Sequence, residues 1–180
     1  MKLPNIKILD EKNKLLRQKS KPVTFPLSKE EKQDIKDMLL YLKMSQIDEE
    51  REKYDLRAGM GLAYVQIGKL KRIFVIVEEL EDGSFENYVV INPKIISKSE
   101  ELIYVGEGEG CLSVNRPVEG IVPRNARIKV RAYDEDGNVD HLTVTLKDND
   151  LVMELHYYVY ENCDVITRTT VLINKGKEKV

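Results

Sequence analysis

Apolar residues recur with the period of a helix in the first third of the chain. The apolar stripe consists of Ile35, Met38, Leu39 and Leu42. The spacing of these residues at i, i+3, i+4 and i+7 predicts an amphipathic helix over roughly residues 29–44, with the stripe in the core. Ser28, followed three residues later by Glu31, forms a capping-box pattern that places the start of this helix.

Beyond the charged stretch 46–57, the pattern changes to the short apolar runs and alternation of β-strands. The predicted strands cover residues 73–77, 88–91, 94–97, 127–133 and 142–146. Asp82-Gly83 and Asp136-Gly137 are turn signals, and we expect Asn92-Pro93 to break the second strand. The fold class predicted from these elements is α+β, with an N-terminal helix and a mixed or antiparallel sheet.

The C-terminal segment supports two predictions. Asp148, Asn149 and Asp150 offer helix N-caps, and Leu151, Val152 and Leu155 follow at helical spacing, which favours a helix over 150–160. The aromatic and β-branched runs 157–160 and 165–173, joined by a turn at 161–164, favour a β-hairpin instead. The helix is the preferred prediction, and the hairpin is its competitor.

Composition adds limits on domain number, partners and compartment. The 180 residues fit one domain over 1–180, and the net charge of −2 argues against binding nucleic acid by neutralising many phosphates. No run of 18 apolar residues predicts a membrane helix. The polar N-terminus contains no signal-peptide pattern, and two cysteines without such a signal predict reduced thiols in the cytoplasm.

The rarest residues limit any metal site. The sequence contains two His and two Cys, and their spacing excludes a zinc finger. His141 falls on the polar face of a predicted strand, where a solvent-exposed side chain is expected. Cys163 is expected to be a buried core residue.

Two glycine-containing segments carry candidate chemistry. In Gly59-Met60-Gly61-Leu62-Ala63-Tyr64-Val65-Gln66, the glycines allow close approach of a ligand, and the Gln66 amide offers a donor to developing negative charge. Taken alone, this segment also fits a tight loop before a strand. In Gly106–Ser113, Cys111 fits a metal ligand, a nucleophile or a buried loop cysteine, and composition does not choose among them.

Together the two segments resemble the first two signature motifs of peptide deformylases. The matching residues are Gly59, Gly61-Leu62-Ala63 and Gln66, followed by Glu109-Gly110-Cys111-Leu112-Ser113. The resemblance extends over roughly residues 15–147 and is to the longer subtype of Gram-positive bacteria. It implies metal-dependent removal of the formyl group from the N-terminal formyl-methionine of nascent polypeptides. Ferrous iron is the implied metal, with Zn²⁺ or Ni²⁺ as alternatives.

The resemblance also implies roles for individual residues. Cys111 matches a metal ligand, and Gln66 and the backbone N–H of Leu112 match the donors that stabilise the oxyanion. Met60, Gly61 and Gly110 match positions whose backbone pairs with an extended peptide substrate. Glu109 and Arg124 match a structural ion pair. Tyr64-Val65 departs from the family, which usually has Ala-Pro there.

The third family motif, Q-H-E-x-x-H on a helix, is not intact. A count without gaps from Leu146-Lys147 places the first motif histidine on His156, but Tyr157 and Tyr160 occupy the positions of the general acid/base Glu and the second His. Cys163 would share a helical face with His156 and Tyr160 and is an alternative third ligand. The tail after about residue 147 therefore departs from the family, either by divergence or as a non-homologous sequence.

Three functions follow as hypotheses. The first is a peptide-deformylase-like hydrolase of impaired activity, which would act on formylated nascent peptides. The ribosome surface is a candidate partner under this hypothesis, and no membrane or specific nucleic-acid partner is expected. The second is a non-catalytic binder of extended N-terminal peptides. The third is a thiol hydrolase that uses Cys111, for which neither histidine has a visible carboxylate partner.

Overall fold

The structure is a computed structural model of the 180-residue chain, and it describes residues 1–106, 108–145, 151–159 and 166–174, with side chains up to 139. Contacts divide the chain into two compact units. The first contains residues 1–93, 109–119 and 133–138, and the second contains 94–108, 120–132 and 139–180. Both segments of candidate chemistry lie in the first unit, except for residues 106–108.

The helical elements before the first strand all belong to the first unit. They are η1 (Lys14–Arg17), α1 (Lys29–Gln46) and α2 (Asp48–Tyr54). The predicted helix is confirmed as α1, two residues longer than expected. The capping box is also confirmed: the Glu31 N–H donates to Ser28 Oγ at 3.1 Å, and the Ser28 N–H donates to Glu31 Oε2 at 2.7 Å.

The main sheet contains β1 (Gly61–Ala63), β2 (Ile73–Glu79), β3 (Phe85–Lys98), β6 (Arg127–Tyr133) and β7 (Val139–Thr145) in the order β1-β2-β3-β6-β7. A short 3-10 helix, η2 (Tyr64–Ile67), follows β1. In the first unit, β2 pairs antiparallel with both β1 and β3. The α+β class is confirmed. The strand pairs whose residue register is described, β1–β2, β2–β3, β4–β5 and β8–β9, are all antiparallel.

The predicted break at Asn92-Pro93 is wrong, because β3 continues through it as one 14-residue strand. Asn92 takes φ 50°. Its side chain pairs with the Val23 backbone: Asn92 Oδ1 accepts from the Val23 N–H at 2.7 Å, and Asn92 Nδ2 donates to the Val23 carbonyl at 2.9 Å. A contact between residues 69 apart in sequence therefore stabilises the unusual backbone conformation at Asn92. The β-strand continues on both sides of it.

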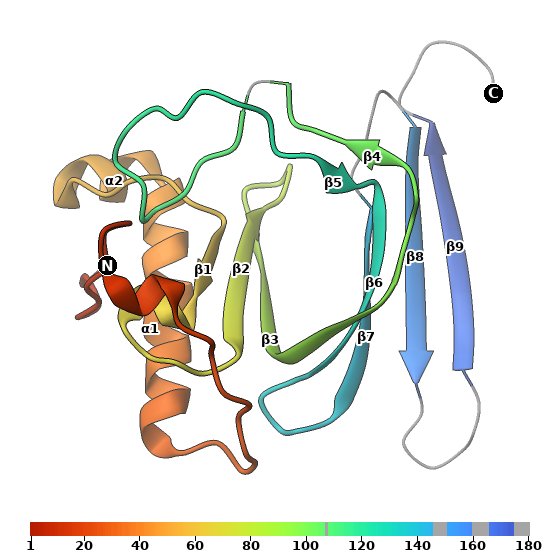
Figure 1. The fold of residues 1–180 in the computed structure, drawn as a ribbon, viewed down its shortest axis with the longest axis horizontal. Coiled ribbons are helices and arrows are strands. Elements are labelled where there is room, and N and C mark those ends of the chain that lie inside the picture. The colour runs from red at the N-terminus through yellow and green to blue at the C-terminus, as the bar shows by residue number, and fades with distance from the viewer. Residues whose placement is uncertain (107, 146–150, 160–165, 175–180) are drawn as a thin grey trace. The chain divides into compact units, whose positions relative to one another are not determined.

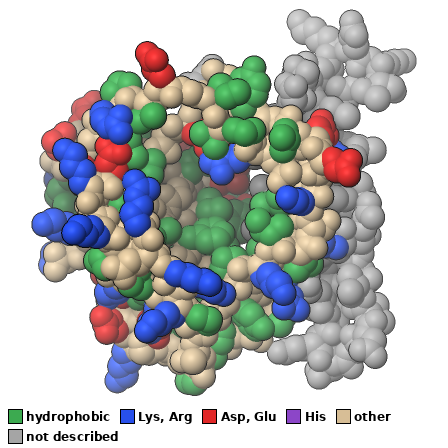
Figure 2. Space-filling model, in the orientation of Figure 1, with side chains coloured by type: hydrophobic (Ala, Val, Ile, Leu, Met, Phe, Trp, Pro, Cys, Tyr) green, Lys and Arg blue, Asp and Glu red, His purple; other side chains and the backbone are tan. Residues whose placement is uncertain are grey.

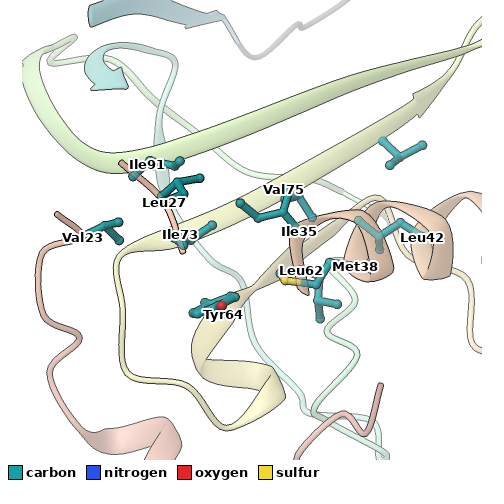
Figure 3. Close-up of a cluster of buried hydrophobic side chains, with 11 residues drawn as sticks. Val23, Leu27, Ile35, Met38, Leu42, Leu62, Tyr64, Ile73, Val75 and Ile91 are labelled. Carbon is teal, nitrogen blue, oxygen red and sulfur yellow. The ribbon is translucent and has the colours of Figure 1, made fainter. Parts of the chain in front are cut away.

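The core of the first unit lies between α1 and β2. Ile35, Met38 and Leu42 on α1 are fully buried against Val75 of β2 and its neighbours, including Leu62. Figure 3 shows the helix side chains directed at the strands, and Figure 1 shows α1 running alongside β1 and β2. This packing fixes the end of α1 close to the Gly59–Gln66 segment.

The second unit contains the short strands β4 (Leu102–Ile103) and β5 (Arg124–Asn125), which pair antiparallel. Asn125 Nδ2 donates to the Ser99 carbonyl at 2.7 Å, and the Arg127 N–H donates to Ser99 Oγ at 3.0 Å. Ala126, Val130 and Ala132 are buried. The predicted strand 127–133 is confirmed as β6, and 142–146 falls within or next to β7.

The preferred prediction of a helix over 150–160 is wrong, and the competing hairpin is correct. β8 (Leu151–Val159) and β9 (Ile166–Asn174) pair antiparallel over nine residue pairs, with His156 opposite Thr169 (Figure 1). The β-branched and aromatic residues of both runs outweigh the N-cap signals before Leu151, because their side chains suit a paired strand better than a helix. Tyr160 and Cys163 lie outside the described residues.

Basic, acidic and hydrophobic side chains all lie on the face drawn in Figure 2. None of the helices in the described ranges is long and apolar enough to cross a membrane. The side chain of His141 in β7 is outside the described set, so its predicted exposure stays a prediction.

Candidate functional site

The Gln66 side chain is held at both ends of its amide. It extends from η2, which follows directly on β1. Gln66 Oε1 accepts from the Ala63 N–H at 2.8 Å, and Gln66 Nε2 donates to Ser113 Oγ at 3.1 Å. The Gln66 carbonyl accepts from the Leu9 N–H at 2.8 Å. Because these contacts fix the side-chain orientation, the N–H₂ group faces the segment that contains Cys111.

The segment around Cys111 is a tight turn against η2. The Val114 N–H donates to the Cys111 carbonyl at 3.0 Å, and the Ser113 carbonyl accepts from the Glu11 N–H at 2.7 Å. Cys111 Sγ lies 3.9 Å from Gln66 Nε2, and the Cys111 side chain is exposed. The fold thus brings Gln66 and Cys111, which are 45 residues apart, to one place.

Arg57 binds the same turn and was missed by the sequence analysis. Its guanidinium donates to three backbone carbonyls, those of Cys111 at 3.2 Å, Leu112 at 3.1 Å and Val114 at 2.7 Å. It also donates to Asn115 Oδ1. No local pattern predicts these contacts, because the acceptors lie more than 50 residues away. Its position two residues before Gly59 is the only available signal.

Gly59 allows Leu112 to pack closely against the first segment. A Cβ placed on Gly59 would lie 2.9 Å from Leu112 Cδ1, which is closer than real contacts allow. The end of α1 holds the Gly59 backbone: Gln46 Nε2 donates to the Gly59 carbonyl at 3.1 Å, and the Gly59 N–H donates to Ser45 Oγ at 3.2 Å. The absence of a side chain at Gly59 therefore has a packing reason.

The predicted peptide-binding positions lie at exposed backbone. Met60, Gly61 and Gly110 are all exposed. Gly61 begins β1, the end strand of the sheet order, whose residue Leu62 pairs with Val75 of β2. An end strand offers a row of backbone groups to an added strand. Peptide binding at these residues stays a prediction.

Tyr64, which replaces the usual family Ala, is buried under the site. Its hydroxyl donates to Asp34 on α1, and Lys69 also pairs with Asp34. Burial, followed by the hydrogen bond and charge of Asp34, raises the pKa of Tyr64 well above its usual range, so the hydroxyl stays a donor. Burial acts to lower the pKa of Lys69, but the hydrogen bonds to Asp34 and Glu30 outweigh it, and the net direction is upward. The Tyr therefore ties η2 to α1 and does not enter the site.

The remaining predicted site residues are divided between the two units. His156 lies on β8 in the second unit, and its role as a metal ligand stays a prediction. Glu109 belongs to the first unit and Arg124 to the second, so their ion pair also stays a prediction. Among residues whose side chains are described, no group of three or more His, Cys, Asp or Glu could hold a metal ion.

Comparison with known proteins decides the family. The model of polypeptide deformylases matches residues 6–156. This chain belongs to the peptide deformylase family. The peptide deformylase of Oceanobacillus iheyensis is 50% identical over 127 residues, which are 71% of this chain and 69% of the relative. That of Macrococcus caseolyticus is 45% identical over 150 residues, which are 83% of this chain and 80% of the relative.

Solved peptide deformylases share the fold. A probable peptide deformylase from Synechococcus phage S-SSM7 superposes with a TM-score of 0.61 at 33% identity, over 78% of this chain and 84% of that one. The peptide deformylase from Thermotoga maritima has a TM-score of 0.59 at 28% identity, over 78% and 81% of the two chains. The resemblance read from the two motifs is confirmed, and the family depends on a metal.

Proposed function

We propose that this chain binds the formylated amino terminus of nascent polypeptides and removes the formyl group at a strongly reduced rate. The observation that carries the proposal is the Gln66 amide, which is oriented by Ala63 and Ser113 and lies beside Cys111. Family membership supplies the reaction class. The proposed place of action is the cytoplasm, where formylated chains leave the ribosome.

The chemistry follows from groups of this chain. An extended peptide would pair with the exposed backbone near Gly61 and Gly110, which places the formyl carbonyl by Gln66. When the formyl carbon becomes tetrahedral, negative charge develops on its oxygen. Gln66 Nε2 and the Leu112 N–H would donate to that oxygen, and such preorganised donors contribute most when charge develops.

The family's metal centre is only partly matched. Cys111 would supply one ligand, and ferrous iron is the metal we propose, with Zn²⁺ or Ni²⁺ as alternatives. The described side chains do not form a three-ligand group around Cys111. In sequence, Tyr157 stands where the family has its proton-transferring Glu. The residues therefore do not match the complete set of metal ligands and the proton-transferring Glu of the family. For this reason we propose that hydrolysis of the formyl group is slow.

Formate release tests this proposal. The full chain, reconstituted anaerobically with ferrous iron, is incubated with a formyl-methionyl peptide, and formate and bound metal are both measured. We expect formate release far below that of the Oceanobacillus iheyensis relative assayed in parallel, and a further loss in the Gln66→Ala variant. Turnover equal to the relative would disprove the impairment. Calorimetry with the same peptide then tests recognition, and absence of binding would disprove the proposal as a whole.

A further inference from the structure

Arg57 stands out because one side chain binds four acceptors of a single turn. Its guanidinium contacts the carbonyls of Cys111, Leu112 and Val114 and the side chain of Asn115. A planar guanidinium presents several N–H groups in a fixed fork, whereas a lysine ammonium acts as a compact point charge. The arrangement therefore depends on arginine specifically.

The contact with the Cys111 carbonyl fixes the direction of one backbone donor. The peptide group between Cys111 and Leu112 contains both the Cys111 carbonyl and the Leu112 N–H. In a trans planar peptide these two groups point in opposite directions. Because Arg57 NH2 donates to the Cys111 carbonyl at 3.2 Å, the Leu112 N–H is directed away from Arg57.

The same contact strengthens that donor. A cation hydrogen-bonded to a peptide carbonyl polarises the peptide group, and linked hydrogen bonds reinforce one another. The Arg57 side chain is exposed, so it adds little to the hydrophobic core. Its four contacts are all with residues 111–115 of the turn.

We infer that Arg57 is a positioning residue for the reaction, which orients the Leu112 N–H toward the oxygen that gains charge and holds Cys111 in its turn. This inference rests on the proposed function, since the value of the Leu112 donor depends on that reaction. It extends the site from the two motif segments to a residue that precedes the first of them.

The experiment compares Arg57→Lys with Arg51→Lys as the matched control. Arg51 forms an exposed ion pair with Asp48 at 2.7 Å on α2, and its side chain has no hydrogen bond with the described residues 111–115 of the turn. Both substitutions are made in the full chain. Hydrogen exchange of the Val114 amide, which bonds to the Cys111 carbonyl at 3.0 Å, reports on the turn.

Arg57→Lys is expected to speed Val114 exchange by about tenfold, the effect of losing one net hydrogen bond. It should lower kcat for formate release with little change in KM, because the Leu112 donor acts mainly in the transition state. Arg51→Lys should change none of these quantities. Val114 exchange unchanged in Arg57→Lys would overturn the inference, as would faster exchange with an unchanged kcat.

Failure of the proposed function is recognised separately. If the parent chain neither binds nor deformylates the peptide, the proposed function fails whatever the Arg57 variants do. In that case the role in the reaction fails too, and the exchange rate of the Val114 amide measures only how firmly Arg57 holds the turn.

Discussion

The amide of Gln66 uses its oxygen and its nitrogen for different tasks. The oxygen accepts from Ala63, and the nitrogen faces Ser113 and Cys111. An uncharged amide offers an acceptor on one side and a donor on the other, whereas an ionised carboxylate only accepts. This division explains why the side chain type matters as much as its position.

Gln66→Glu tests that division. The carboxylate retains the acceptor for the Ala63 N–H but places negative charge beside Cys111. We expect formate release to fall about 100-fold, the size of effect found when an oxyanion donor is lost. Gln66→Ala, which also removes the acceptor for the Ala63 N–H, should lose at least as much. Formate release at the parent rate in Gln66→Glu would contradict the geometry.

Gly59→Ala tests the packing of Leu112. The added Cβ would meet Leu112 Cδ1 at 2.9 Å, so Leu112 must move. We expect the free energy of unfolding to fall by about 1–3 kcal/mol, as for other overpacked sites, measured by urea titration. Gly61→Ala is the matched control, because its Cβ would meet only the Val75 carbonyl oxygen at 3.6 Å. Equal destabilisation of both variants would contradict the packing argument.

At the scale of elements, the sequence predicts what local patterns determine. The capping box at Ser28 and the stripe from Ile35 place α1 to within two residues at its end. The continuity of β3 through Asn92 could not be predicted, because it depends on the distant Val23 backbone. The two motif segments identify Gln66 and Cys111, but not Arg57, whose acceptors are distant in sequence.

The C-terminal hairpin determines the result expected when the missing Glu and His of the third family motif are introduced by mutation. The family motif needs its two histidines at i and i+4 on a helix, and residues 156 and 157 lie on strand β8 instead. We therefore expect Tyr157→Glu combined with Tyr160→His to leave metal content and formate release at parent levels. Both are measured after iron reconstitution, by elemental analysis and the formate assay. A gain in both would show that the segment adopts the family helix.

At the scale of the whole molecule, ion pairs connect helix α1 to the loop that follows η2. Lys71 Nζ lies 2.5 Å from Glu31 Oε1, and Lys69 pairs with Asp34. Burial acts to raise the pKa of Glu31, but the hydrogen bonds from Lys71 and Ser28 outweigh it, so the net pKa is lowered. A lowered carboxyl pKa adds stability above the unfolded-state value, and that stability is lost as pH falls through the folded-state value.

Glu31→Gln tests this linkage. The pH is lowered from about 6 to about 3, an interval that includes the ordinary pKa of glutamate. Over this interval the free energy of unfolding should fall more for the parent than for the variant, because the variant has no charge to neutralise at position 31. Urea titrations across this range measure both. Glu30→Gln is the control, since Glu30 also pairs with a lysine but is largely exposed. Parallel curves for the parent and Glu31→Gln would refute the linkage.

The division of the chain into two units has a consequence for synthesis. The first unit ends at residue 138, so all of its residues are made before those of the β8–β9 hairpin. Small domains fold within the seconds that bacterial synthesis of a few tens of residues takes. Proteolysis of ribosome-bound chains arrested at increasing lengths would detect a protected first unit before the hairpin is made. The contact between Gln66 and Cys111 would then form before the C-terminal hairpin is made. Substitutions in the hairpin should therefore leave the formation of this contact unchanged.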